Sequence, residues 1–282
     1  DTADQVARRY PSVILLRQER NEGFARGNNL GLREAVGEWV LTLNPDAWLA
    51  PDWLETLLEF AKDKPHLGMA GGKILKPSEG SSAQIIDSLG IEIFRSRRVR
   101  DIGMGWMDAA IPAAPFRVFG ICAAAALYRR SMLNDTQIRG EIFPERFFAY
   151  YEDADLAWRA WRRGWETWTI PTATAWHRRG GSPVGAKFSR RLTHRNRWWL
   201  IARNESFGET LLAAPEVYVH ELLMILRVIR HPSLLKAGWE SLGGVVAAIR
   251  DYRRLKPLNF SPPPFQRGLG FSSGSILRSL RG

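Results

Sequence analysis

In the first 75 residues, short β-branched and aliphatic runs alternate with segments of helical periodicity. The predicted strands are Ser12–Arg17, Glu38–Leu43 and Leu67–Leu75, and the predicted helices are Asn28–Val36 and Asp52–Asp63. A strand–helix–strand order needs crossover connections, which place helices on the faces of a parallel sheet. We therefore predict an α/β fold with a mostly parallel sheet flanked by helices.

The second half of the chain divides into two parts of different character. Three strands and one helix are predicted, at Val118–Tyr128, Trp165–Ile170, Ala173–His177 and Asp153–Arg163. After residue 203 the pattern becomes helical and includes the strongly apolar run Val217–Ile229. This run is interrupted by charged residues, so it is not read as a membrane-spanning helix. We predict one domain over residues 1–203 and a helical C-terminal extension over residues 204–282.

The positive charge of the chain is concentrated in one stretch. The chain has 40 Lys and Arg against 29 Asp and Glu, a net charge of +11. Residues 159–203 contain 11 basic residues and only one acidic residue, Glu166. Such a stretch indicates a site for an anion, either a diphosphate, a nucleic acid or an anionic lipid, unless it is a solvated basic face. The single cysteine, Cys122, excludes an internal disulfide and favours a reducing, cytoplasmic location.

A carboxylate follows the second predicted strand. Asp46 lies in the sequence Asn44-Pro45-Asp46, just after Glu38–Leu43. Open α/β sheets bind ligands at the carboxyl ends of their strands. A carboxylate at that position, beside Asn44, can hold a divalent metal ion through oxygen. The alternative is a plain turn.

A cluster of acidic residues opens the helix predicted in the second half. The segment Phe147–Leu156 reads FFAYYEDADL and contains Glu152, Asp153 and Asp155. The N-terminus of a helix stabilises ionised carboxylates. One of these acids is therefore a candidate general base for a hydroxyl nucleophile. The alternative is acidic capping of the helix.

Two basic segments offer candidate phosphate contacts. His177 follows a predicted strand and precedes two arginines and two glycines, so it is a candidate metal ligand or diphosphate contact. Arg195 and Arg197, in the run HRNRWW, could bind phosphate oxygens. The alternatives are a structural histidine and the basic face of an amphipathic helix.

The order of these segments resembles the family-2 glycosyltransferases with the GT-A fold, in the branch that contains many bacterial rhamnosyltransferase-like enzymes. The matching segments are Asn21–Gly31 (NEGFARGNNLG), Leu43–Asp46 (LNPD), Ala124–Ser131 (AAALYRRS), Phe147–Leu156, His177 with Gly181 and Ser182, and Arg195–Arg197. The resemblance covers roughly residues 1–203. Each motif is weak alone, and their common order carries the comparison.

The resemblance implies inverting transfer of a sugar from a nucleoside-diphosphate sugar to an acceptor hydroxyl, in the synthesis of cell-surface polysaccharide or glycolipid. Asp46 and His177 would hold Mg²⁺ or Mn²⁺, Asp153 would be the base, and Glu152 would support it or contact the acceptor. The residues expected along the nucleotide and diphosphate are Asn21, Gly23, Arg26, Gly27, Asn28, Asn44, Arg195 and Arg197. The implied partners are a donor such as dTDP-rhamnose or a UDP-sugar and a saccharide or lipid-linked acceptor. A lipid-linked acceptor would bring the protein to the inner face of the cell membrane as a peripheral protein.

The chain departs from the family pattern in two ways. The family begins with a strand–helix–strand unit that ends in a nucleotide-binding Asp-Asn segment, and the resemblance implies that this unit is absent here. Ala123 replaces a frequent glycine, which implies a tighter acceptor pocket. Two alternatives remain, a catalytically inactive sugar-binding relative and a nucleic-acid-binding module. The acidic cluster around Asp153 would repel nucleic acid, so no nucleic-acid partner is expected.

Overall fold

A computed structural model describes residues 2–77, 84–179, 185–228, 239–241, 243–245, 248–251 and 263–266. The helices are α1 (Thr2–Arg9), α2 (Gly23–Glu34), α3 (Trp53–Ala61), α4 (Arg130–Thr136), α5 (Glu152–Arg162), α6 (Ala186–Asn204), α7 (Phe207–Leu212) and α8 (Ala214–Val228), with short 3₁₀ helices η1 (Asp108–Ala110) and η2 (Glu145–Phe147). The strands are β1 (Trp39–Leu43), β2 (Ala47–Leu49), β3 (Leu67–Lys76), β4 (Ile85–Ser88), β5 (Ile91–Ile93), β6 (Val99–Asp101), β7 (Phe116–Arg117), β8 (Ala125–Arg129) and β9 (Glu166–His177).

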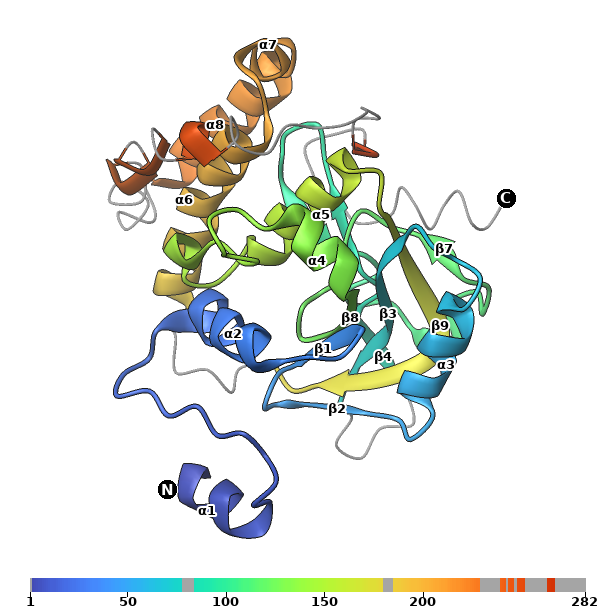
Figure 1. Ribbon diagram of the computed structural model, residues 1–282. Helices are drawn as coiled ribbons and strands as arrows, with labels where there is room; N and C mark the ends of the chain where they lie inside the picture. Colours follow the sequence, from blue (N-terminus) through green and yellow to red (C-terminus); the bar gives the residue numbers. More distant parts are fainter. Residues whose placement is uncertain are drawn as a thin grey trace.

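The central sheet has seven strands and is mixed (Figure 1). Its main order is β1-β8-β3-β9-β2, with β4 paired to β3 and β7 paired to β9. The predicted α/β class is confirmed, but the prediction that the sheet is mostly parallel is wrong, because only β3 and β9 pair in parallel among the described strands. The reason is that β8 enters antiparallel between β1 and β3. Strands β1, β3 and β9 still run in one direction, so their carboxyl ends share one edge.

Strand β9 replaces two predicted strands with one of 12 residues. Its pairing with β3 shifts register between Gly72 and Lys73. A Cβ atom at Gly72 would lie 1.9 Å from the carbonyl oxygen of Ala173. The close approach of the two strands therefore requires glycine at this position.

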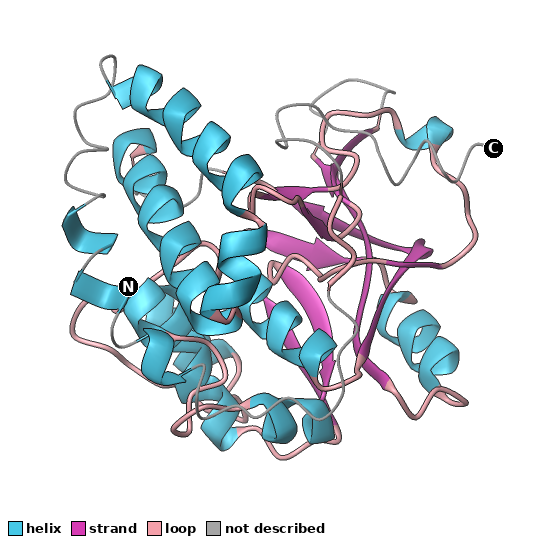
Figure 2. Ribbon diagram, turned by 90° about the horizontal axis from the view of Figure 1, so that it is seen from above, coloured by secondary structure: helices cyan, strands magenta, loops and turns pink. Residues whose placement is uncertain are grey.

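Helices lie on both faces of the sheet (Figure 2), and apolar side chains pack between the helices and the strands. Helix α3 buries Trp53, Leu57 and Ala61 against one face. On the other face, α5 contributes Leu156 and Trp158 to the larger core, which α6 extends. The sheet thus lies between a single helix and a helical layer that carries α5 and its acidic N-terminus.

The N-terminal segment differs from the prediction. Residues 12–17 form no strand, and Val13 and Ile14 are exposed. The predicted strand is wrong because these residues find no partner: within the described chain, β1 pairs with β8 alone. Helix α2 also begins earlier than predicted, at Gly23, because the Ala25 N–H donates to the Phe148 carbonyl (3.1 Å).

Helix α6 ends at Asn204, where the predicted domain boundary lies. Helices α7 and α8 follow, as the periodicity predicts. The division into two domains at this point stays a proposal. None of the helices in the described ranges has the length and hydropathy of a membrane span.

Candidate active site

The site lies at the edge of the sheet where β1, β3 and β9 end. Asp46 comes three residues after β1, and His177 is the last residue of β9. The intervening β2 pairs antiparallel with β9 and aligns Ala47 with His177. The Arg178 N–H donates to the Asp46 carbonyl (2.9 Å), which fixes the two segments side by side. The sheet therefore brings together two residues that are 131 positions apart in the sequence.

Asp46, His177 and Asn44 form the candidate metal site. Asp46 Oδ1 lies 3.3 Å from His177 Nε2, and the Asn44 side-chain amide lies 3.5 Å from the same nitrogen. Neighbouring ligands in an octahedron with bonds of about 2.1 Å are about 3.0 Å apart, so the Asp46–His177 pair fits one Mg²⁺ or Mn²⁺ ion. No group of three or more His, Cys, Asp or Glu side chains suited to a metal is found in the described part of the chain.

An ion network with the buried Asp87 at its centre stands behind His177, and the sequence pattern gave no indication of it. Asp87 on β4 places Oδ2 3.3 Å from His177 Nδ1, and Arg179 Nε contacts both Asp87 oxygens (2.7 and 2.8 Å). Arg179 Nη2 also contacts Asp101 Oδ2 (2.7 Å) on β6. Burial alone would raise the pKa of Asp87, but hydrogen bonds from His177 and Arg179 outweigh it and leave that pKa below its usual value.

The predicted base lies near the metal candidates. Asp153, at the start of α5, accepts a hydrogen bond from the backbone of Ala123. The Asn44 N–H donates to the carbonyl of the next residue, Ala124 (2.9 Å). The segment before β8 therefore contacts Asp153 and also the turn that carries Asp46. Both predicted acids belong to one end of the sheet.

The surroundings of Glu152 and Asp153 at the start of α5 raise the pKa of both side chains. Burial, followed by the charge of Asp101, raises the pKa of Asp153 to about 6. Burial and the charge of Asp153 raise the pKa of Glu152 well above its usual value. Glu152 Oε2 is buried with no hydrogen-bond partner among the described residues. A pKa near the working pH suits a general base, so Asp153 fits its predicted role better than Glu152 does.

A strained turn presents these acids. Phe148, Tyr150 and Tyr151 all have positive φ angles (68°, 70° and 71°), a conformation unfavourable for large side chains. Fully buried Asn196 on α6 stabilises it by donating from Nδ2 to the carbonyls of Phe147, Ala149 and Tyr150 (3.0, 2.8 and 2.7 Å). Sequence reasoning assigned roles to the arginines on either side of Asn196 and included Asn196 only as part of the matching segment, without a role. The signal was an amide in the middle of a helical basic run.

The predicted nucleotide-side residues lie at and before the start of α2. A Cβ atom at Gly23 (φ 83°) would lie 2.5 Å from the Phe148 carbonyl oxygen, so α2 packs directly on the strained turn. Asn21 Oδ1 accepts from the Gly23 N–H (2.9 Å), and Asn28 Nδ2 donates to the Phe24 carbonyl (2.9 Å). Exposed Arg26 lies 3.7 Å from Glu22, and a Cβ atom at Gly27 would meet open space. These residues are near the turn of Asp153, and their contact with a nucleotide stays a prediction.

The two arginines predicted on α6 have partners within the protein. Arg195 Nη2 donates to the Phe147 carbonyl (2.9 Å), and burial lowers its pKa to about 10. Buried Arg197 donates from Nε to the Ser96 carbonyl (3.0 Å) and pairs with Glu221. Neither contact involves Asp46 or His177. Their predicted role toward a diphosphate stays untested, and Gly181 and Ser182 lie outside the described residues.

The basic stretch is largely neutralised by carboxylates from other segments. Its members with such partners are Arg159, Arg162, Arg163, Arg179, Arg191, Arg195, Arg197 and Arg203. The Arg159 and Arg203 guanidinium groups share the buried Asp155, whose pKa they lower against the effect of burial. The local charge of +10 in the sequence therefore does not become an equally basic surface.

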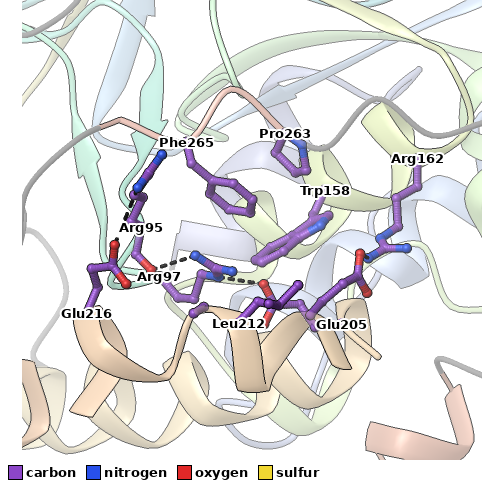
Figure 3. A pocket seen from close by; sticks show the side chains of 11 residues that line it. Arg95, Arg97, Trp158, Arg162, Glu205, Leu212, Glu216, Pro263 and Phe265 are labelled. Atoms are coloured by element: carbon purple, nitrogen blue, oxygen red, sulfur yellow. Dashed lines mark hydrogen bonds and ion pairs between the residues drawn. The ribbon is translucent and has the colours of Figure 1, made fainter. Parts of the chain in front are cut away.

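A separate cavity of about 230 Å³ lies between α5, α7, α8 and residues 263–266 (Figure 3). Three arginines enter it, and each pairs with a glutamate: Arg95 with Glu216, Arg97 with Glu205 and Arg162 with Glu209. Phe265 packs on Trp158 (ring centroids 5.5 Å apart) and under the Arg97 guanidinium. The lining contains none of the predicted catalytic or metal residues, and its paired charges show no preference for an anion.

Comparisons with known proteins find glycosyltransferases, both by sequence and by fold. The family model described as "Glycosyl transferase family 2" matches residues 1–136. A curated relative from Mycobacterium tuberculosis, N-acetylglucosaminyl-diphospho-decaprenol L-rhamnosyltransferase, is 28% identical over 204 residues, and the match covers 64% of each chain. An uncharacterized glycosyltransferase from Haemophilus influenzae is 33% identical over 55 residues, which are 20% of this chain and 19% of that protein.

Among solved structures, GalNAc-T7 with UDP, GalNAc and Mn²⁺ superimposes with a TM-score of 0.56 at 12% identity. This match covers 78% of the present chain and 41% of the other, and it supports the fold alone. The chain spans less than two thirds of the length of the mycobacterial relative. Motif order, family match and fold agree: the chain is similar to glycosyltransferase family 2 over residues 1–136, and its fold is that of a GT-A glycosyltransferase.

Proposed function

We propose that this protein transfers a sugar from a nucleoside-diphosphate sugar to an acceptor hydroxyl with inversion at the anomeric carbon. One observation carries the proposal: Asp46 with His177, and Asp153, flank the segment before β8 at one end of the sheet. A metal site beside a carboxylate of raised pKa is the arrangement that such a transfer needs.

The donor diphosphate would lie at Asp46 and His177. These side chains, with Asn44, would hold Mg²⁺ or Mn²⁺, whose positive charge stabilises the negative charge of the leaving diphosphate. The nucleotide would extend toward the start of α2, along Asn21 and Gly23. The donors that we propose are dTDP-rhamnose or a UDP-sugar, and the name of the mycobacterial relative favours rhamnose.

Asp153 would take the proton from the acceptor hydroxyl. With a pKa of about 6 it is ionised at neutral pH yet basic enough to accept a proton as the hydroxyl oxygen attacks. Attack from the side opposite the diphosphate inverts the anomeric carbon. Glu152 has a buried oxygen without a hydrogen-bond partner among the described residues, and it would support Asp153 or contact the acceptor.

The acceptor that we propose is a saccharide carried on a lipid diphosphate, in the synthesis of cell-surface polysaccharide or glycolipid. The name of the mycobacterial relative includes such an acceptor. Helices α7 and α8 expose large apolar side chains, among them Phe207, Leu212 and Tyr218. We propose that this face contacts the inner surface of the cell membrane peripherally, which places the acceptor near a cytoplasmic enzyme.

The proposal is tested by incubating the protein with Mn²⁺, a panel of nucleoside-diphosphate sugars and a lipid-diphosphate saccharide, and measuring product by mass spectrometry. Asp153→Asn should lower turnover by about 10²–10⁴-fold and leave donor binding largely intact, because the base acts in the transition state. Asp46→Ala should instead weaken Mn²⁺-dependent donor binding. Glu59→Gln, on the exposed face of α3, is the control and should be unchanged.

Two results would contradict the proposal. Donor binding without any transfer or hydrolysis would favour a catalytically inactive sugar-binding relative. Near-normal turnover of Asp153→Asn would exclude Asp153 as the base and make Glu152 the next candidate. The alternative of a nucleic-acid-binding module receives no support from the basic stretch, since most of its arginines pair with carboxylates.

A further inference from the structure

We propose that Asp87 is a positioning residue that holds the His177 ring with Nε2 directed at Asp46, and that Arg179 fixes Asp87 for this purpose. The inference rests on the proposed metal-dependent function and adds to it Asp87, which no motif contains, and a role for Arg179 toward Asp87. Asp87 contacts His177 on the side of the ring away from Asp46, and Arg179 contacts Asp87. Neither residue would therefore touch the metal ion.

The first step is the geometry of the ring. His177 Nδ1 lies 3.3 Å from Asp87 Oδ2, and Nε2 lies 3.3 Å from Asp46 Oδ1. The imidazole therefore bridges a fully buried carboxylate on β4 and a half-buried one after β1. A histidine that binds a metal must present an unprotonated nitrogen, and the hydrogen bond at its other nitrogen decides which one that is. An acceptor at Nδ1 leaves Nε2 free to bind.

The second step is the state of Asp87. Arg179 Nε contacts both of its oxygens, at 2.7 and 2.8 Å, and an arginine side chain can only donate. Arg179 Nη2 is held in turn by Asp101 Oδ2 at 2.7 Å. The guanidinium holds Asp87 in place and donates to both of its oxygens, so Asp87 offers acceptor atoms to His177. The network thus ties the end of β9 to β4 and β6 and orients the ring from behind.

The third step is the consequence of removing one charge. An asparagine at position 87 must turn its single oxygen toward Arg179, because Arg179 cannot accept. Its amide then faces His177 Nδ1 as a donor and favours the tautomer with the proton on Nε2. That proton occupies the position at which the metal would bind. Loss of a group that orients a metal-binding histidine typically weakens metal binding by about 10–100-fold.

Mn²⁺ alone is the probe, titrated into the full chain and followed by the relaxation of water protons. We expect Asp87→Asn to weaken Mn²⁺ binding by about 10–100-fold, close to the effect of Asp46→Ala. The matched control is Asp135→Asn, which removes a similar carboxylate–arginine pair with Arg163 (Nε contacts of 3.0 and 3.1 Å). In the described part of the chain, the partners of Asp135 are Arg163 and Trp165 and include no histidine. Its Mn²⁺ affinity should stay within twofold of the unmodified protein.

The tautomer of His177 gives a second readout, which a merely structural role of Asp87 would not change. Long-range ¹H–¹⁵N spectra of the Mg²⁺-saturated unmodified protein, assigned with His177→Gln, should show the proton on Nδ1. Asp87→Asn should move it to Nε2. The position of the proton in the unmodified protein is measured without the Asp87→Asn variant. The proposal therefore stays testable if Asp87→Asn does not fold.

The outcomes separate the inference from the function on which it rests. If Asp46→Ala weakens Mn²⁺ binding but Asp87→Asn binds within twofold of the unmodified protein, Asp87 is no positioning residue and the metal site stands. If neither Asp46→Ala nor Asp87→Asn changes Mn²⁺ binding, or the unmodified protein binds none, the metal site itself is wrong. A proton on Nε2 in the Mg²⁺-saturated unmodified protein also overturns the inference.

Discussion

At the scale of single residues, Asp153 is unusual because the protein opposes its ionisation while hydrogen bonds favour it. Burial and the charge of Asp101 raise its pKa, whereas backbone donors at Ala123 and Ala154 lower it. The balance leaves the pKa at about 6. Since the folded-state pKa exceeds the usual value, the protonated acid favours folding at low pH, and this contribution is lost as the pH rises through 6. Ionised Asp153 thus lowers the stability of the fold, a cost that the proposed catalytic role would explain.

The pKa of Asp153 predicts the pH dependence of transfer. The base must be ionised to accept a proton, so kcat/KM should rise with pH around a midpoint near 6 and level off above 7. The measurement is initial rate against pH from 5 to 8 at saturating Mn²⁺, with protein integrity followed by circular dichroism. The residual activity of Asp153→Asn should lack this rise. A flat profile in the unmodified protein would mean that another group is the base.

At the scale of structural elements, the turn before α5 depends on a residue from α6. Asn196 bonds three carbonyls of a turn in which three aromatic residues have positive φ. We predict that Asn196→Ala lowers stability by about 1–3 kcal/mol, because carbonyls become buried without a partner. It should also lower kcat by about 100-fold through misplacement of Asp153, with KM for the donor nearly unchanged.

Asn204→Ala is the matched control for this prediction. Asn204 is a buried amide on the same helix, and it donates to Asp155 on α5 and to the Leu200 carbonyl, but to none of the three carbonyls that Asn196 contacts. Urea unfolding should show a comparable loss of stability in both variants. Only Asn196→Ala should also show the large loss of turnover. Equal kinetic effects in the two variants would show that Asn196 acts through general stability.

The same elements show what could be predicted from the sequence. Strand ends and helix starts are local features, so Asp46, His177 and Asp153 were placed correctly at the ends of β1 and β9 and the start of α5. Asp87 and Asn196 were not found, because their roles depend on partners 90 and 46–49 positions away. The predicted strand over Ser12–Arg17 was wrong for a related reason: its composition suits a strand, but pairing requires a neighbour that no local pattern supplies.

At the scale of the whole molecule, the positive charge that is concentrated in one stretch of the sequence does not form a correspondingly basic surface. The basic stretch folds into α5, β9 and α6, where acidic residues from the rest of the chain neutralise most of it. Exposed apolar side chains gather instead on α7 and α8, which lie together at one end of the molecule (Figure 1). Contact with a membrane would therefore depend on apolar burial more than on charge.

This distribution predicts how the protein binds a bilayer. It should float with phosphatidylglycerol vesicles, and moderate salt should reduce binding only slightly, since apolar burial is not screened. The double variant Phe207→Ser/Leu212→Ser removes two side chains that are 84% and 85% exposed, and it should bind at least about tenfold more weakly. Val36→Ser, 93% exposed and located after α2, is the control and should float like the unmodified protein. Equal flotation of all three would exclude the α7–α8 face, and an unmodified protein that stays with the soluble fraction at low salt would exclude membrane contact altogether.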